Sequence, residues 1–207
     1  MSRFGSAVIL AGGKSTRMGF DKQRVLIGGM LMVHYIARQL ESVFEEIVIV
    51  SNTPELYAKS KYKLVTDVFK DKGPLSGIHA GLKHCKSDYV YFVAGDMPVI
   101  NTAYIGYMKS RVDQQDVFGC VTEVRGYMEP FNAFYSKSSA EIIETSIKKD
   151  HLKISRLVQE QKHLLIKEEQ ARHYAPDLAM FMNLNTIQRM DCCSVLKEPI
   201  SVLLATT

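Results

Sequence analysis

A short apolar run stops at two glycines near the start of the chain, and this junction limits what the chain can fold into. Residues 7–11, Ala-Val-Ile-Leu-Ala, are suited to a buried strand. Gly12 and Gly13 then allow a sharp turn and let backbone N–H groups approach a phosphate without a Cβ in the way. Arg17 and Lys22 follow with positive charge. The junction predicts a strand followed by a phosphate-binding loop, and its alternative is a plain strand-to-helix turn.

The two best-known glycine loops that bind nucleotides do not match this segment. A Walker loop requires Gly-x-x-x-x-Gly-Lys-[Ser/Thr], and Gly13-Lys14-Ser15 matches its end, but Val8 stands where the first glycine belongs. A dinucleotide fingerprint requires Gly-x-Gly-x-x-Gly, and Lys14 stands at its second glycine. A nucleotide bound here must therefore be held by another kind of loop.

Strand-like runs alternate with helical segments along the first half of the chain, which predicts an α/β fold with a parallel sheet. The predicted strands cover residues 7–11, 47–50, 64–66 and 89–94, and the predicted helices cover residues 30–44 and 77–85. The second half is less regular, with strands predicted over residues 117–124, 131–135 and 164–166 and helices over residues 139–148 and 152–161. Thr186 is a candidate cap for a last helix that begins at Ile187. Since no linker divides the chain, we expect one domain over residues 1–207.

Composition favours a small anionic ligand over a nucleic acid. The net charge is +4, but no dense block of Lys and Arg forms the basic face that DNA or RNA needs. The four cysteines have no Cys-x-x-Cys spacing, so we expect free thiols in a reducing cytosol. No signal peptide and no membrane-spanning run is predicted. The apolar tail over residues 195–205 is expected to pack on the body of the protein or on a partner chain.

Polar residues follow the predicted strands at the points where the strands end. Asn52 comes after the second strand, Asp67 after the third, and Gly95-Asp96 after the fourth. Because parallel strands end at the same edge of an open sheet, where such sheets bind ligands, we expect these residues and the glycine loop to converge on one rim. Asp96 follows a strongly apolar strand and favours a hard cation such as Mg²⁺, with help from Asp67.

The motifs, taken in order, resemble those of the MobA family, the molybdenum cofactor guanylyltransferases. The similarity begins at residues 10–22 and covers nearly the whole chain. It continues through Asn52, Asp67, Gly73-Pro-Leu-Ser-Gly77, Ala94-Gly-Asp-Met-Pro98, Glu129-Pro-Phe-Asn-Ala-Phe-Tyr135 and Asn183-Leu-Asn-Thr186. Family members usually have proline after the last of these motifs, where this chain has Ile187. Since proline at a first helical position is only favourable, this departure has little weight.

The resemblance implies a Rossmann-like, mostly parallel twisted sheet with helices on both faces, of the nucleotide-diphospho-sugar transferase type. It implies that residues up to about 100 bind the nucleotide and that residues 101–207 bind the acceptor. The reaction implied is GMP transfer from GTP to molybdopterin, with Mg²⁺ as the cofactor and with molybdoenzymes or other cofactor-biosynthesis proteins as further partners.

The site residues implied by the resemblance fall into three groups. The nucleotide site would comprise Leu10, Ala11, Gly12, Gly13, Lys22, Asn52, Asp67 and Asp96. Arg17, Lys22 and Asp96 would be catalytic, and Asp96 would also hold the metal. Asn183 and Asn185 would bind the acceptor.

Several alternatives remain open from the sequence. A sister enzyme that transfers CMP to the same cofactor, or a sugar-phosphate nucleotidyltransferase, would keep the same nucleotide residues. A non-catalytic nucleotide-binding regulatory module is a third alternative, against which the joint presence of Arg17, Lys22 and Asp96 argues. We expect no general base, because a phosphate nucleophile is already largely ionised at neutral pH.

Overall fold

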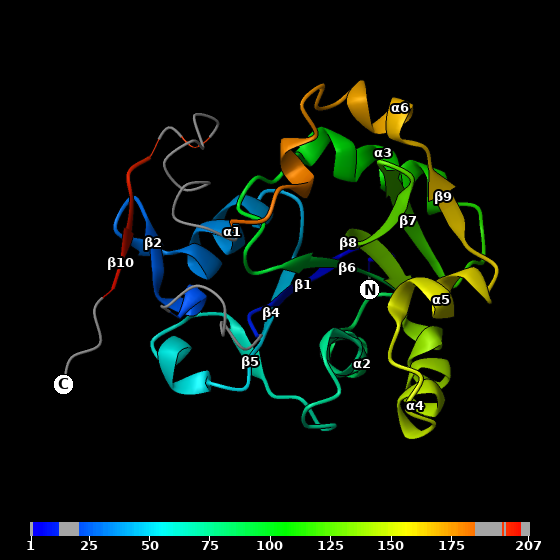
Figure 1. Cartoon of the computed structure of the whole chain (residues 1–207), viewed down its shortest axis with the longest axis horizontal. Helices are drawn as coiled ribbons and strands as arrows, with labels where there is room; N and C mark the ends of the chain where they lie inside the picture. The colour runs from blue at the N-terminus through cyan, green and yellow to red at the C-terminus, as the bar shows by residue number, and fades with distance from the viewer. Residues whose placement is uncertain (1, 13–20, 185–195, 197, 204–207) are drawn as a thin grey trace.

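A seven-stranded sheet forms the centre of the computed structural model, which describes residues 2–12, 21–184, 196 and 198–203 (Figure 1). The strand order is β5-β4-β1-β6-β8-β7-β9. The strands are β1 (Ser6–Leu10), β4 (Glu46–Val50), β5 (Lys63–Val65), β6 (Tyr89–Ala94), β7 (Gly119–Val124), β8 (Tyr127–Ser136) and β9 (Leu164–Ile166). All seven lie at strands predicted from the sequence, with ends that differ by a few residues.

The sheet is mostly parallel, as predicted. The four strands β5, β4, β1 and β6 run in the same direction. Only β8 runs against its neighbours β6 and β7, while β7 and β9 pair in parallel. The carboxyl ends of the four parallel strands of the first half therefore lie side by side at one edge.

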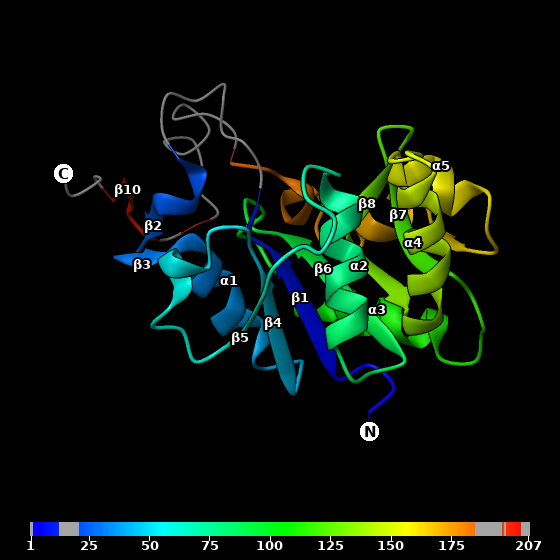
Figure 2. The same ribbon diagram turned by 90° about the horizontal axis from the view of Figure 1, so that it is seen from below.

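Helices cover both faces of the sheet, which confirms the predicted α/β class (Figures 1 and 2). One face packs against α1 (Met32–Leu40), α3 (Thr102–Val112) and α6 (Glu168–Arg172), and the other against α2 (Pro74–His84), α4 (Ala140–Lys148) and α5 (Ile154–Gln159). Alternation along the strands explains this division, since Ile9 and Tyr91 belong to the first core and Val8 and Phe92 to the second. No helix in the described part of the chain has the length and apolar character that a membrane crossing requires.

Three helix predictions were wrong in their bounds. Residues 30–44 correspond to α1 (Met32–Leu40), residues 77–85 to α2 (Pro74–His84) and residues 152–161 to α5 (Ile154–Gln159). The helix expected from residue 30 begins at Met32, because residues 25–31 form a hairpin of β2 (Val25–Ile27) and β3 (Met30–Leu31). Gly28 and Gly29 have φ values of 58° and 76°, which a tight two-residue hairpin turn requires. The helix expected from residue 77 begins earlier, at Pro74, a residue favoured at the first helical position. Helix α3 was not predicted.

The tail packs on the body of the protein, one of the two arrangements expected for it. Strand β10 (Ile200–Val202) pairs with β2 in an antiparallel manner and completes a small sheet of order β10-β2-β3. Leu196 is buried and belongs to the core on the face of the sheet that α1, α3 and α6 cover. The predicted last helix, with Thr186 and Ile187, lies outside the described residues.

Two cysteines can be compared with the prediction of free thiols. Cys85 and Cys120 are free and buried, and burial raises the pKa of each thiol to about 12. A thiol with so high a pKa is almost never ionised and is chemically inert at neutral pH. Cys192 and Cys193 lie outside the described residues.

Candidate active site

The residues that follow the parallel strands meet at one rim, as the sequence predicted. Backbone hydrogen bonds join the strand ends: Ala11 N donates to Val50 O (2.8 Å), and Gly95 N donates to Leu10 O (3.0 Å). A Cβ on Gly95 would lie only 3.1 Å from Leu10 O, so glycine lets the chain after β6 pass this close to β1. The rim is thus a continuous edge made by β5, β4, β1 and β6.

Lys22 and Asp96 are in direct contact at this rim. Lys22 Nζ lies 3.2 Å from Asp96 Oδ2, and each side chain is about a quarter exposed, at 27% and 23%. Lys22 opens a short 3₁₀ turn, η1 (Lys22–Arg24), which Asp21 caps by accepting a hydrogen bond from Gln23 N (3.0 Å). The structure therefore brings together two of the three predicted catalytic residues. Arg17, the third, lies outside the described residues.

Asn52 and Asp67 form a second polar pair on the same rim. Asn52 Nδ2 donates to Asp67 Oδ2 (3.3 Å), and Asp67 N donates to Asn52 Oδ1 (3.4 Å). Burial raises the pKa of the Asp67 carboxyl. Its other oxygen, Oδ1, is buried and accepts no hydrogen bond from the described residues, although buried carboxylate oxygens are normally satisfied. Asp67 can therefore accept a hydrogen bond from a ligand donor.

The first residues of the glycine loop lie between these two pairs. Ala11 is buried, and Leu10 contacts the start of α2, since its Cδ2 lies 3.0 Å from the position of a Cβ on Gly77. Gly12 is exposed, and a Cβ built on it would meet no described atom within 4 Å. The described residues therefore leave room beside the backbone of Gly12. Gly13 lies outside the described residues.

The segment that carries Asn183 is tied to Asp96. Leu184 N donates to Asp96 O (2.8 Å), which places Asn183 next to the loop after β6. The preceding turn, η4 (Ala179–Phe181), is held by Asn132, whose Nδ2 donates to Met180 O and whose Oδ1 accepts a hydrogen bond from Tyr91 Oη (2.5 Å). Asn185 lies outside the described residues.

Glu129 is a carboxyl that our sequence prediction did not include among the site residues. It lies on β8, the strand next to β6, and its Oε1 accepts a hydrogen bond from Phe131 N (3.2 Å). Burial raises the pKa of Glu129 to about 7, with a further contribution from the negative charge of Asp96. The signal was present in the sequence, because Glu129 opens one of the motifs shared with the MobA family.

The residues present suit a magnesium ion. Among the described residues no three His, Cys, Asp or Glu side chains form a metal-binding group. Mg²⁺ does not need such a group, since it is commonly held by one or two carboxylates together with water and substrate phosphate oxygens. Asp96 provides a partly exposed carboxylate, and the carboxyl of Glu129 lies near enough to feel its charge. Asp67, which we expected to help to hold the cation, is hydrogen-bonded to Asn52 instead.

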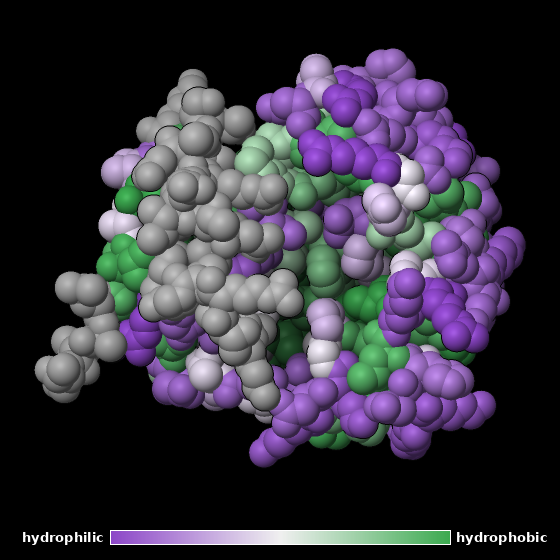
Figure 3. Space-filling view, viewed as in Figure 1, coloured by the Kyte–Doolittle hydropathy of each residue, from purple (hydrophilic) through white to green (hydrophobic). Residues whose placement is uncertain are grey.

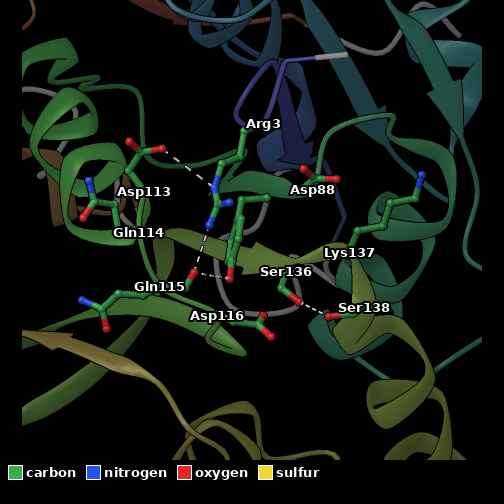
Figure 4. Close-up of a pocket in the computed structure, with 10 residues that line it drawn as sticks. Arg3, Asp88, Asp113, Gln114, Gln115, Asp116, Ser136, Lys137 and Ser138 are labelled. Atoms are coloured by element: carbon green, nitrogen blue, oxygen red, sulfur yellow. Dashed lines mark hydrogen bonds and ion pairs between the residues drawn. The ribbon is translucent and has the colours of Figure 1, made fainter.

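A pocket lies at the end of the sheet opposite to the Asp96 rim. It has a volume of about 530 Å³ and is lined by residues before β6, after α3 and after β8 (Figure 4). Arg3 at its centre is already engaged, because its Nη2 donates to Gln115 O (2.9 Å) and Val112 O (3.4 Å) at the end of α3. Three aspartates share the lining with two basic residues. Since open parallel sheets bind ligands at their carboxyl ends, the Asp96 rim is the candidate active site.

The space-filling view shows a hollow near the middle of one face. Its floor is apolar, and polar and apolar residues border the side that is coloured (Figure 3). A concave surface with an apolar floor and a few polar groups is typical of small-molecule sites.

The fold and this polar rim define a nucleotide-binding α/β transferase, and comparisons with known proteins give the family. A family model described as "MobA-like NTP transferase domain" matches residues 7–164. The chain belongs to this family and is therefore a nucleotidyltransferase.

Individual relatives agree with this assignment. The chain is 47% identical over 184 residues to the molybdenum cofactor guanylyltransferase of Syntrophotalea carbinolica, with 89% of this chain and 88% of that protein covered. It is 43% identical over 192 residues to the probable molybdenum cofactor guanylyltransferase of Peptoclostridium acidaminophilum, covering 90% and 87%. The fold matches the crystal structure of molybdopterin-guanine dinucleotide biosynthesis protein A from Archaeoglobus fulgidus with a TM-score of 0.77 at 22% identity, covering 88% and 93%.

Proposed function

We propose that this protein transfers GMP from GTP to the terminal phosphate of molybdenum-bearing molybdopterin. The observation that carries the proposal is the contact between Lys22 Nζ and Asp96 Oδ2, 3.2 Å apart, beside the backbone that leads to Asn183. A cation and a carboxylate there suit the neutralisation of a triphosphate and the binding of its metal. The names of the relatives supply the substrates.

The reaction forms one bond and breaks one. An oxygen of the acceptor's terminal phosphate attacks the α-phosphorus of GTP, and the bond between the α-phosphorus and the bridging oxygen breaks. Pyrophosphate leaves with the bonding electrons, and the product is molybdopterin guanine dinucleotide. Catalysis by positioning and charge neutralisation is the general pattern for such transfers.

Each residue of the rim has a separate proposed role in binding or catalysis. Leu10, Ala11, Gly12 and Gly13 hold the nucleotide through their backbone, and Asn52 and Asp67 bind its nucleoside end. Lys22 and Arg17 neutralise the leaving pyrophosphate. Asp96 would hold Mg²⁺, which when bound would offset negative charge on the phosphates. Asn183 and Asn185 bind the acceptor, so residues up to about 100 form the nucleotide half and residues 101–207 the acceptor half.

The setting of the reaction is part of the same proposal. We infer a cytosolic enzyme, which suits the inert thiols of Cys85 and Cys120. Molybdoenzymes or other cofactor-biosynthesis proteins are its proposed partners, since the product must be passed on.

Pyrophosphate release is the direct test of reaction, base and acceptor. With Mg²⁺, we expect release with GTP only when molybdenum-loaded molybdopterin is present, and at least tenfold less with CTP or UTP. A preference for CTP would identify the sister cytidylyltransferase, and release with a sugar phosphate would identify the sugar-nucleotide alternative. Binding of GTP without release in the presence of the acceptor would favour a regulatory module.

The proposed reaction uses no general base from the protein. Glu129 is the residue on which to test this, because its pKa of about 7 would suit a general base. A phosphate monoester has a second pKa near 6, so the nucleophile is ionised at pH 7 without help. We expect the Glu129→Gln variant to keep turnover within about threefold, whereas loss of a true general base costs about a hundredfold or more. Turnover should be measured from pH 5.5 to 8.5. If turnover of the unaltered protein rises with pH around pH 7, and Glu129→Gln loses both this rise and most of its turnover, Glu129 is a general base.

A further inference from the structure

Gln23 connects two parts of the rim that are far apart in the sequence. It follows Lys22 directly within the η1 turn. Its side-chain oxygen Oε1 accepts hydrogen bonds from Thr53 Oγ1 (2.7 Å), Ser51 Oγ (3.3 Å) and Tyr57 Oη (3.3 Å). Three hydroxyl groups that follow β4 thus surround one amide that follows the glycine loop.

Two of the three hydroxyl groups belong to buried residues. Tyr57 and Ser51 are buried, at 0% and 2% exposure. Ser51 Oγ also accepts a hydrogen bond from Thr53 N (3.1 Å), which closes a tight turn around Asn52. The segment that holds Gln23 is therefore the same segment that presents Asn52 to Asp67.

The other side of Gln23 is tied to Lys22. Gln23 N donates to Asp21 Oδ1 (3.0 Å), so the turn that carries Lys22 is fixed by its own cap. Lys22 Nζ then reaches Asp96 Oδ2 across the ends of β1 and β6. A shift of the Gln23 side chain would move the backbone of this turn and with it the ammonium group.

We propose that Gln23 is a positioning residue for the transfer reaction. It fixes the distance between the Lys22 turn and the Asn52 loop. The two segments can then bind the phosphate end and the nucleoside end of the same nucleotide at once. This inference rests on the proposed function. It assigns to Gln23 no contact with the substrate, only control over where Lys22 lies.

The substitution chosen for the test should keep the size of the side chain and remove its hydrogen bonds. Methionine has nearly the same length and shape without hydrogen-bonding capacity, so Gln23→Met removes the connection and little else.

The test compares Gln23→Met, Thr53→Val and the double variant in pyrophosphate release. Lys22 acts on charge that grows in the transition state, so its misplacement should lower kcat more than it changes KM. We expect Gln23→Met to lower kcat about tenfold with KM for GTP changed less than about threefold, because small misplacements of catalytic groups are expensive. Thr53→Val should lower kcat in the same way. The double variant should be no worse than Gln23→Met, because both changes break one connection.

The control is Gln115→Met at the opposite end of the sheet, where Gln115 Nε2 bonds only to Arg111 O among the described residues. It should leave kcat unchanged, and thermal unfolding of every variant should be recorded so that rates are compared well below each Tm. If Gln23→Met does not fold, Thr53→Val and Tyr57→Phe remove the hydroxyl donors singly and test the same connection.

Failure of this inference can be separated from failure of the proposed function. Unchanged kcat in Gln23→Met with an inactive Asp96→Ala would overturn the positioning role and leave the function standing. Multiplicative losses in the double variant would also overturn it, since the two side chains would then act independently. Absence of pyrophosphate release by the unaltered protein with every nucleotide and acceptor would overturn the function itself.

Discussion

Replacing Asp96 with alanine is expected to lower turnover by at least about a hundredfold, the usual scale for losing one preorganised electrostatic element. Asp96 is the contact partner of Lys22 and the carboxylate best placed for Mg²⁺ at the rim. Its loss would leave the ammonium of Lys22 without this partner and the cation without a ligand. Pyrophosphate release at saturating GTP and Mg²⁺ is the measurement.

Asp88→Ala is the matched control, because Asp88 is exposed and lies directly before β6, at the other end of the strand that Asp96 follows. It should keep normal turnover. Near-normal Mg²⁺-dependent turnover in Asp96→Ala would refute the assignment of the active site to this rim.

Replacing Glu129 with glutamine is expected to remove a strong pH dependence of stability. Burial and the charge of Asp96 raise the pKa of Glu129 from 4.5 to about 7 in the folded protein. The unfolded chain releases this proton first, so folding is favoured by Glu129 only while the carboxyl stays protonated. As pH rises from about 4.5 to about 7, the free energy of unfolding should fall by about 3 kcal/mol through this group.

Urea unfolding at pH 5 and pH 8 without divalent cations measures this effect. The fall between the two pH values should be smaller in Glu129→Gln than in the unaltered protein by about 2.5 kcal/mol, because glutamine does not titrate. Glu169→Gln, which changes an exposed residue on α6, should behave like the unaltered protein. Equal pH slopes in all three proteins would show that Glu129 is not held in an apolar environment.

The rim could be predicted from the sequence because it depends on simple geometry. A glycine, an asparagine or an aspartate follows each predicted strand of the first half within two residues, and parallel strands put their carboxyl ends at one edge. Asn52 and Asp67 therefore meet, as do Lys22 and Asp96. The family resemblance added the reaction, which no pattern of strands and polar residues can supply.

The features that were missed depend on local backbone geometry or on distant pairing. Asn132 has φ of 50° at an irregularity between β7 and β8, a conformation that few residues adopt. This irregularity belongs to the strand that carries Glu129. The partners of Gln23 lie about thirty positions away in the sequence, and nothing near Gln23 reveals them. Helix α3 was missed although Tyr104, Ile105 and Met108 mark its buried face.

The pairing of β10 with β2 has a consequence for how the protein is made. The turn that carries Lys22 leads straight into β2, yet the strand that completes that small sheet comes more than 170 positions later in the chain. During synthesis, β1, β4, β5 and β6 can associate long before residues 200–202 leave the ribosome. The first half of the large sheet can therefore assemble early, while the small sheet beside the Lys22 turn is still incomplete. Emergence of residues 200–202 then becomes the step that completes the small sheet next to the Lys22 turn.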